Sequence, residues 1–141
     1  MTLLMKKLLI LLFSLLISFN SYAGNLDGKG LECGPAEEYS NKNMYIWFEN
    51  NLLHVPMINE YEIIWSEPYP YRAATKFISF ADIPKDVPYS VNWWRLKSVN
   101  RETLKITGFN PTRTCIILNS KQQIIDVLNQ IIDDAKSTNK I

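Results

Sequence analysis

The sequence predicts a mainly β protein: an antiparallel meander of about six to eight short strands that ends in one C-terminal amphipathic helix. The chain is rich in Trp, Tyr, Ile and Asn, which favours strands joined by tight turns. Short apolar or alternating segments are separated by Asn, Gly and Pro. A meander of this length either folds as two sheets or forms a small closed or partly closed barrel, and closure removes exposed strand edges.

The N-terminus predicts export. Two lysines precede an almost wholly apolar run at 8–17, and the small pair Ala23-Gly24 follows a more polar stretch. These are the parts of a secretory signal peptide, so residues 1–23 are expected to be removed by cleavage after Ala23. The alternative is an uncleaved membrane anchor, but a spanning helix needs about 20 apolar residues.

The remaining residues, 24–141, are expected to form a single β-rich domain in the periplasm or the extracellular space. Without the two lysines of the signal peptide, 13 of the 15 basic residues remain against 14 acidic residues, which gives a net charge near −1. No basic stripe is present, which argues against binding to nucleic acid. No second apolar segment is long enough to cross a membrane after cleavage.

Export also decides how the two cysteines are interpreted. Cys33 and Cys115 are the only cysteines, and in an oxidising compartment an even count suggests a disulfide. A disulfide between them would close a loop of 82 positions. Such a loop should stabilise the fold by about 4 kcal/mol in the chain-entropy model. A reactive thiol is the alternative, but there is no C-x-x-C motif. A lipid anchor on Cys33 would require that residue directly after the apolar run.

In the first half of the domain, Asn50-Asn51 separates two extended segments and suggests a two-residue hairpin. Pro56 limits the segment that contains it to an edge or a bulge. The strand candidates here are 30–33, 44–49, 52–58 and 61–67.

In the second half, residues 68–72 (PYPYR) cannot form a central strand, because proline lacks a backbone donor. The longest candidate contains the adjacent pair Trp93 and Trp94, which would face opposite sides of a strand. One would fill the core, and the other would lie on the outer face, under the helix or exposed. The strand candidates are 73–80, 89–98, 103–109 and 113–119.

The segment 121–136 predicts the helix. Ser120 and Gln123 form an S-x-x-Q capping box, in which each side chain satisfies a free backbone N–H. A stripe of apolar residues at helical spacing then favours packing on the protein's own sheet. Binding to a membrane is the alternative, but the polar face is not basic. The stripe comprises Ile124, Leu128, Ile131 and Ala135, widened by Ile125 and Ile132.

No catalytic, cofactor or metal residues are predicted. His54 is the only histidine and no zinc-binding spacing surrounds it, so a solvated or hydrogen-bonded imidazole is expected. The adjacent carboxylates at 37–38 and 133–134 do not face each other as a glycosidase requires. An enzyme would need a site assembled by the fold around Glu62, Glu67 or Asp82.

The aromatic residues offer the best candidates for a contact surface. Tyr69, Tyr71 and Arg72 lie on a rigid, Pro-bounded loop, and loops carry binding disproportionately. Trp94, beside Arg95, could stack on a sugar or an aromatic ligand if it is exposed. The alternative is that the tyrosines fold back over a barrel end and that the tryptophan packs in the core.

The order of these segments resembles a group of small exported bacterial proteins. The shared features are an L-D-G-K-G-L-x-C start, a W-F-E/D segment, a W-x-L-N/D-R-x-T-L hairpin, a late cysteine and a C-terminal helix. Here they read LDGKGLEC, YIWFENN, WWRLKSVNRETLKI, RTCIIL and a helix before AKSTNKI. The likeness spans 26–141, but residues 68–88 match nothing in the group and the hairpin is longer. It implies a paired Cys33 and Cys115 and one exported domain in a Gram-negative cell, and it carries no activity.

These observations favour a non-enzymatic binding module. It would hold a small apolar or aromatic ligand, or dock on an envelope protein, without a cofactor. The first alternative is an inhibitor of a cell-wall hydrolase, which would need a projecting loop such as 68–72 or 81–88. The second is a carboxylate-based hydrolase.

Overall fold

The computed structural model describes residues 5–7, 26–34, 43–107 and 113–138. Its strands are β1 (Lys29–Cys33), β2 (Met44–Glu49), β3 (Leu52–His54), β4 (Pro56–Asn59), β5 (Glu62–Trp65), β6 (Tyr69–Pro70), β7 (Arg72–Ala73), β8 (Phe77–Ser79), β9 (Ser98–Asn100), β10 (Lys105–Thr107) and β11 (Arg113–Leu118). Its labelled helices are α2 (Tyr89–Asn92) and α3 (Lys121–Thr138).

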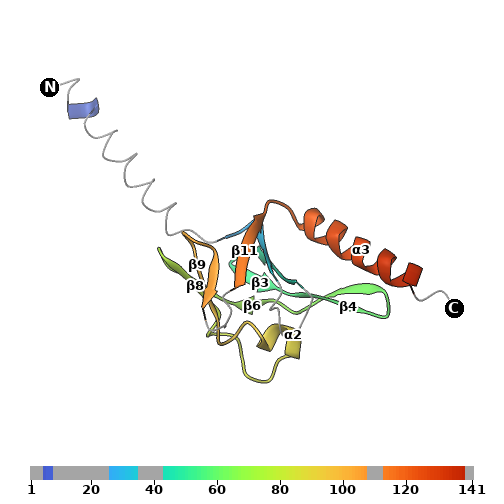
Figure 1. The fold of residues 1–141 in the computed structure, drawn as a ribbon. Coiled ribbons are helices and arrows are strands. Elements are labelled where there is room, and N and C mark those ends of the chain that lie inside the picture. The colour runs from blue at the N-terminus through green and yellow to red at the C-terminus, as the bar shows by residue number, and fades with distance from the viewer. Residues whose placement is uncertain (1–4, 8–25, 35–42, 108–112, 139–141) are drawn as a thin grey trace.

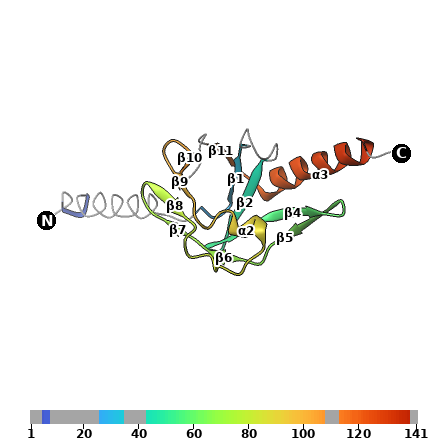
Figure 2. The ribbon, with the colours of Figure 1, turned by 60° about the horizontal axis from the view of Figure 1, so that its bottom comes forward.

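Nine of the strands form one antiparallel sheet in the order β6-β3-β2-β1-β11-β10-β9-β8-β7. The two edges of this sheet, β6 and β7, are separated in sequence only by Tyr71, so the sheet nearly closes into a barrel. Strands β4 and β5 form a separate two-stranded ribbon that extends from the barrel beside α3 (Figures 1 and 2). The predicted mainly β fold with one C-terminal helix is confirmed.

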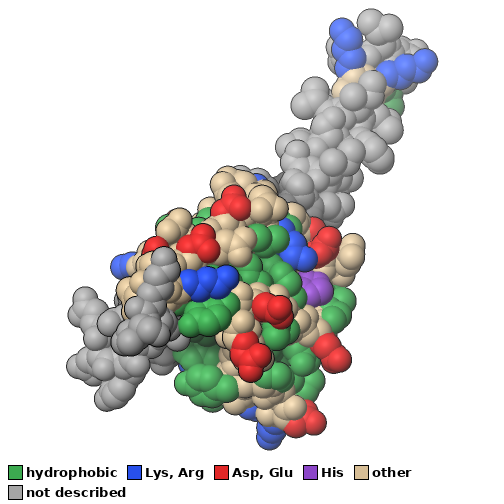
Figure 3. All heavy atoms as spheres, turned by 90° about the vertical axis from the view of Figure 1, so that its right-hand side faces the viewer, with side chains coloured by type: hydrophobic (Ala, Val, Ile, Leu, Met, Phe, Trp, Pro, Cys, Tyr) green, Lys and Arg blue, Asp and Glu red, His purple; other side chains and the backbone are tan. Residues whose placement is uncertain are grey.

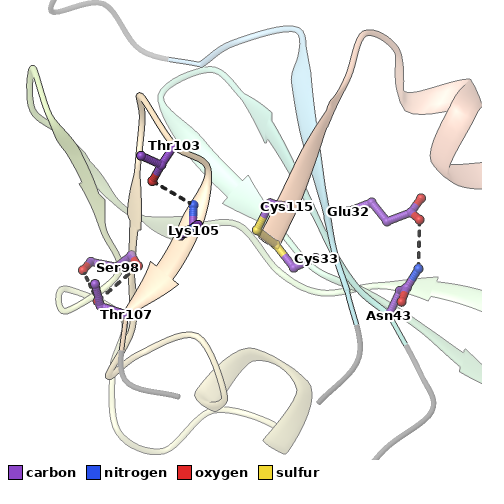
Figure 4. Close-up of a disulfide and its surroundings, with 8 residues drawn as sticks. All are labelled: Glu32, Cys33, Asn43, Ser98, Thr103, Lys105, Thr107 and Cys115. Atoms are coloured by element: carbon purple, nitrogen blue, oxygen red, sulfur yellow. Dashed lines mark hydrogen bonds between the residues drawn. A yellow bond between two sulfur atoms is a disulfide. The ribbon is translucent and has the colours of Figure 1, made fainter. Parts of the chain in front are cut away.

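A disulfide joins the first strand to the last. Cys33 and Cys115 lie opposite each other in the β1–β11 pair, with an S–S distance of 2.05 Å (Figure 4). Both cysteines are buried in the barrel core. The predicted bridge is therefore confirmed, and the structure pairs the first strand with the last.

The predicted hairpin at Asn50-Asn51 is present. Both residues have positive φ, 53° and 61°, and the pair directly connects β2 to β3. A second two-residue turn of the same kind, at Glu60-Tyr61, connects β4 to β5 with φ of 51° and 66°. The sequence did not indicate this second turn, because neither Glu nor Tyr favours positive φ.

The prediction of a strand over 89–98 is wrong. Residues 89–92 form α2, and helical turns continue through the backbone bonds from Trp94 N to Val91 O and from Lys97 N to Trp94 O. Pro88 precedes the helix and starts it with φ −54°. Val91 and Trp94 are fully buried, and their spacing of three residues matches a helical turn rather than a strand.

Two other predicted strands are divided. Residues 73–80 contain the end of β7, a turn and β8, while 52–58 is split between β3 and β4. Val55 and Pro56 stand at the second division, where the chain leaves the barrel sheet for the ribbon. The predicted strand is thus interrupted next to Pro56, where β3 of the barrel sheet ends and β4 of the ribbon begins.

Helix α3 begins at the predicted capping box. The Gln123 backbone N–H donates to Ser120 Oγ at 3.2 Å, and the Asn119 N–H donates to Gln123 Oε1 at 2.8 Å. The helix packs Ile124 and Leu128 on the outer face of the sheet. The buried stripe also includes Ile132, whereas Ile131 and Ala135 of the predicted stripe are exposed and half-buried. On the sheet, Ile124 and Leu128 form one buried cluster with Tyr45, Trp47 and Leu118.

Candidate functional site

The barrel has an open cavity of about 550 Å³ near the start of β1 and the end of β11. Strands β1, β2, β8 and β11 contribute to its wall, and the turn between β9 and β10 lies across its side. The lining residues are Leu26, Asp27, Lys29, Gly30, Leu31, Phe48, Ile78, Arg101, Leu104, Ile117 and Asn119.

The inner wall of this cavity is apolar. Leu31, Phe48 and Ile78 are buried members of the barrel core. Ile117 is 49% exposed, and it lines the cavity at the end of the last strand. Because the three core residues are at most 3% exposed, the apolar surface that an entering group would meet belongs to less buried lining residues such as Ile117 and Leu104.

Leu104 reaches the cavity from a strained turn. Its φ is 58°, a value that branched side chains rarely adopt. Two backbone bonds hold the turn, from Leu104 N to Asn100 O at 2.7 Å and from Cys115 N to Leu104 O at 2.8 Å. Because Cys115 also forms the disulfide, the cavity wall is tied to the covalent link between β1 and β11.

The rim of the cavity is polar and hydrogen-bonded. Lys29 Nζ donates to Asn119 Oδ1 at 2.8 Å, which bridges the start of β1 and the residue after β11. Asp27 Oδ1 accepts the Asn51 N–H at 3.0 Å. Arg101 Nη1 donates to the Ala74 carbonyl at 2.8 Å. The rim thus offers both signs of charge beside an apolar interior.

Tyr71 closes the barrel beside this rim. Its hydroxyl accepts the Leu26 N–H at 3.0 Å, and its ring lies 4.7 Å from the ring of Phe48. Burial is the main reason that the pKa of Tyr71 is raised above its usual value. Tyr71 was predicted as part of an external contact surface, and the structure places it half-buried against the core.

The other residues of the predicted contact surface lie in different settings. Tyr69 is half-buried against the core, whereas Arg72 is exposed and its Nε lies 2.6 Å from Asp82 Oδ2. Trp94 is 0% exposed and packs against Phe80 and Trp93, so it does not belong to a contact surface and the alternative of a core position is the one found. The helical turn at 89–97 gives the reason, because it directs Trp94 inward beside Val91.

Two basic side chains, Lys97 and Arg113, lie against Trp93 beside α2, and the sequence did not indicate this arrangement. Arg113 is only 5% exposed, and its guanidinium carbon lies 5.0 Å from the ring centre of Trp93. Lys97 Nζ lies 4.9 Å from the same ring. Burial, and then the charge of Arg113, lower the pKa of Lys97. This group supports the packing of α2 against the end of the barrel.

The residues considered for enzymatic chemistry do not line the cavity. His54 is half-buried, while its neighbours Leu53 and Val55 are buried in the core, as the alternation predicts. Glu62 and Glu67 are exposed on or beside the ribbon, and Asp82 pairs with Arg72. The pair Glu37-Glu38 lies outside the described residues.

Within the described ranges, no three His, Cys, Asp or Glu side chains are grouped so that they could hold a metal ion. In the same ranges, no helix has the length and apolar character needed to cross a membrane. Most of the expected signal peptide lies outside them.

No protein-family model, curated protein or solved structure matches the chain significantly.

Proposed function

We propose that this protein is an exported, non-enzymatic binding module that holds a small apolar or aromatic ligand in the mouth of its barrel. The observation that carries the proposal is the cavity of about 550 Å³ with an apolar wall and a hydrogen-bonded polar rim. Ligand sites are typically concave, largely apolar and supplied with a few polar groups, and barrel mouths are among their usual places.

The architecture suits a preformed site. The disulfide and the hydrogen bonds of the rim hold the wall in place, so a ligand would not have to order it. Each buried methylene of the ligand would contribute about 0.8 kcal/mol before the losses of association. The disulfide also fits an oxidising location, and we propose the periplasm or the extracellular space. The exported bacterial group that the chain resembles agrees with this location.

The test compares two neighbouring residues of β11. Ile117 lines the cavity, and Ile116, which is 54% exposed, does not. With the fluorescent probe N-phenyl-1-naphthylamine, Ile117→Asp should weaken binding by about tenfold or more, because it places a charge in the apolar wall. Ile116→Asp should bind the probe as the wild type does. Equal affinities, or no probe binding to the wild type, would contradict the proposal.

The natural ligand can then be sought directly. Purified protein is exposed to extracts of the cell envelope, and retained molecules are identified by native mass spectrometry. A molecule retained by the wild type and by Ile116→Asp, but not by Ile117→Asp, would be the expected ligand.

A second candidate function is inhibition of a cell-wall hydrolase. Such an inhibitor needs a projecting element, and besides the loops that the sequence suggested, the β4–β5 ribbon extends from the barrel (Figure 1). The absence of inhibition across a panel of lysozymes at micromolar protein would remove this candidate.

A further inference from the structure

We propose that the β4–β5 ribbon is a docking element for another protein, one whose surface is basic. This inference is independent of the cavity, because none of the ribbon residues lines it. It rests on the packing of the ribbon against α3, the exposed apolar side chains of its open face, its charge and the conformation of its tip.

Helix α3 supports one face of the ribbon. Ile63 and Trp65 of β5 pack against the cluster that contains Ile124 and Leu128 of α3. Lys121 Nζ lies 4.6 Å from the ring centre of Trp65. At the other end of the helix, Lys136 Nζ lies 5.7 Å from the ring centre of Tyr61. An isolated hairpin is only marginally stable in water, and this support along its length gives it a defined shape.

The opposite face of the ribbon is open and carries an apolar pair, Met57 and Ile64, beside a polar pair. The register pairs Met57 with Ile64 and Asn59 with Glu62, which places these four side chains away from the face that packs on the helix. Met57 and Ile64 are each 41% exposed. At the tip, Tyr61 is 44% exposed. Grouped exposed apolar side chains of this kind mark interaction surfaces.

The open face and the tip of the ribbon carry carboxylates and no basic residue of their own, since the lysines nearest to the ribbon, Lys121 and Lys136, belong to α3 and lie against Trp65 and Tyr61. No lysine or arginine occurs between residues 43 and 71, a stretch that includes both ribbon strands. Glu60, Glu62 and Glu67 are exposed, and none of them forms an ion pair within the part of the chain that the structure describes. Figure 3, which views the ribbon and helix side of the molecule, shows carboxylates and hydrophobic side chains interspersed on this face, together with some lysine or arginine side chains. Electrostatic complementarity therefore favours a basic partner.

The tip is held in an unfavourable conformation. Glu60 and Tyr61 both have positive φ, although neither residue is Gly, Asn or Asp. Strained backbone that persists in a fold is concentrated where it serves binding or catalysis. Here it sets Tyr61 at the end of a supported ribbon, and tyrosine is among the residues that most often dominate interface energy.

The carboxylates of the ribbon favour a basic protein over a second copy of the chain or an anionic lipid surface. A symmetric dimer through the ribbon would bring the same carboxylates of two copies together. An anionic lipid surface would repel them in the same way. A different protein with basic residues around an apolar recess satisfies both the charge and the apolar face.

The first stage of the test finds what the ribbon touches. A photo-crosslinking side chain is placed at Ile64 of the full chain in the cells that produce it, and at Leu96, 80% exposed, as a control. We expect Ile64 to give a product with another protein that has an excess of basic residues, and Leu96 to give none. No product from Ile64, a product with a second copy or with an acidic protein, or equal products from both positions would overturn the proposal.

The second stage measures binding of the purified crosslinked protein. Met57→Ser with Ile64→Ser should raise Kd by about tenfold or more, because it removes the apolar contact. Glu60→Gln with Glu62→Gln and Glu67→Gln should raise Kd similarly and reduce its dependence on salt. The matched controls Leu96→Ser and Glu102→Gln should leave Kd unchanged.

Circular dichroism and thermal unfolding establish that each variant is folded. The glutamine changes are isosteric and exposed, so they keep the test valid if the serine variant is unstable. Unchanged Kd in the folded ribbon variants would overturn the proposal while leaving the cavity function untouched.

Discussion

Gly30 lies in a closely packed site between the sheet and α3. A Cβ atom at this position would lie 2.8 Å from Ile124 Cδ1, 3.0 Å from the Ile46 carbonyl oxygen and 3.2 Å from Trp47 Cε3. Gly30→Ala should therefore lower the free energy of unfolding by about 1–3 kcal/mol, measured by urea denaturation, because the Ile124 side chain must repack in a closely filled site and the Ile46 carbonyl is fixed in the neighbouring strand. At Gly34 the nearest atom is Thr114 O at 3.5 Å, so Gly34→Ala is the control and should have a much smaller effect.

Glu60 stores strain in the ribbon turn. An L-residue in the left-handed region is disfavoured by about 1–2 kcal/mol, and glycine removes this penalty but makes the unfolded chain more flexible. Glu60→Gly should thus raise the free energy of unfolding by about 0.5–1 kcal/mol. Glu62→Gly, within β5, should instead lower it. Thermal and urea unfolding of both variants check the prediction, and a loss of stability in Glu60→Gly would contradict it.

Tyr71 makes stability sensitive to alkaline pH. Burial raises the pKa of Tyr71 in the folded protein above its ordinary value of 10.0, so the unfolded chain loses this proton first. Stability contributed by Tyr71 is therefore complete below about pH 10 and declines as the pH rises further. Burial raises the pKa of Tyr45 as well, so Tyr71→Phe should reduce this decline without abolishing it.

Urea midpoints between pH 9 and pH 11 measure the effect. Burial lowers the pKa of Lys97, so its contribution to the free energy of unfolding rises with pH in that range. This contribution is the same in the wild type and in Tyr71→Phe. An equally steep alkaline decline in Tyr71→Phe would show that Tyr71 does not contribute.

Helix α3 depends on its first turn. Ser120 Oγ accepts the Gln123 N–H, one of the donors that a helix start leaves without an intrahelical partner. Ser120→Ala should lower the free energy of unfolding by about 1 kcal/mol. Ser137, whose Oγ donates to the Asp134 carbonyl near the other end, is the control, and Ser137→Ala should have little effect. Equal losses in the two variants would mean that the cap is not the cause.

The segment 89–98 shows how one pattern can support two elements. Its alternation is compatible with a strand, but Val91 and Trp94 also have the spacing of a buried helical face. Pro88, which favours a helix start, was the local signal for the helical alternative. The packing of Trp94 against Phe80 selects the helix in the folded protein.

The disulfide joins the first and last strands in the middle of the barrel sheet, away from the edges β6 and β7 where the sheet nearly closes. Cys33 and Cys115 are separated by 82 positions, and their strands are adjacent in the middle of the nine-stranded sheet. Cys33→Ser and Cys115→Ser should each lower the free energy of unfolding by about 4 kcal/mol and leave the fold unchanged. Chemical denaturation with matched circular dichroism spectra checks both points. A large difference between the two variants would argue against a shared structural role.

The sequence by itself determined the features that depend on short-range chemistry. The Asn50-Asn51 turn, the Ser120 capping box and the helical stripe after it follow from residues a few positions apart. The two cysteines allowed one pairing, and the need to satisfy strand edges favoured closure.

Only the tertiary structure decided which residues meet. The cavity joins Leu31, Phe48 and Ile117 from three strands, and strand register, which no local pattern specifies, brings them to one barrel mouth. The ribbon turn at Glu60-Tyr61 lacks the residues that usually mark such turns. The pairing of Asn59 with Glu62 and the packing of β5 on α3 impose it, because long-range contacts there outweigh local backbone preference.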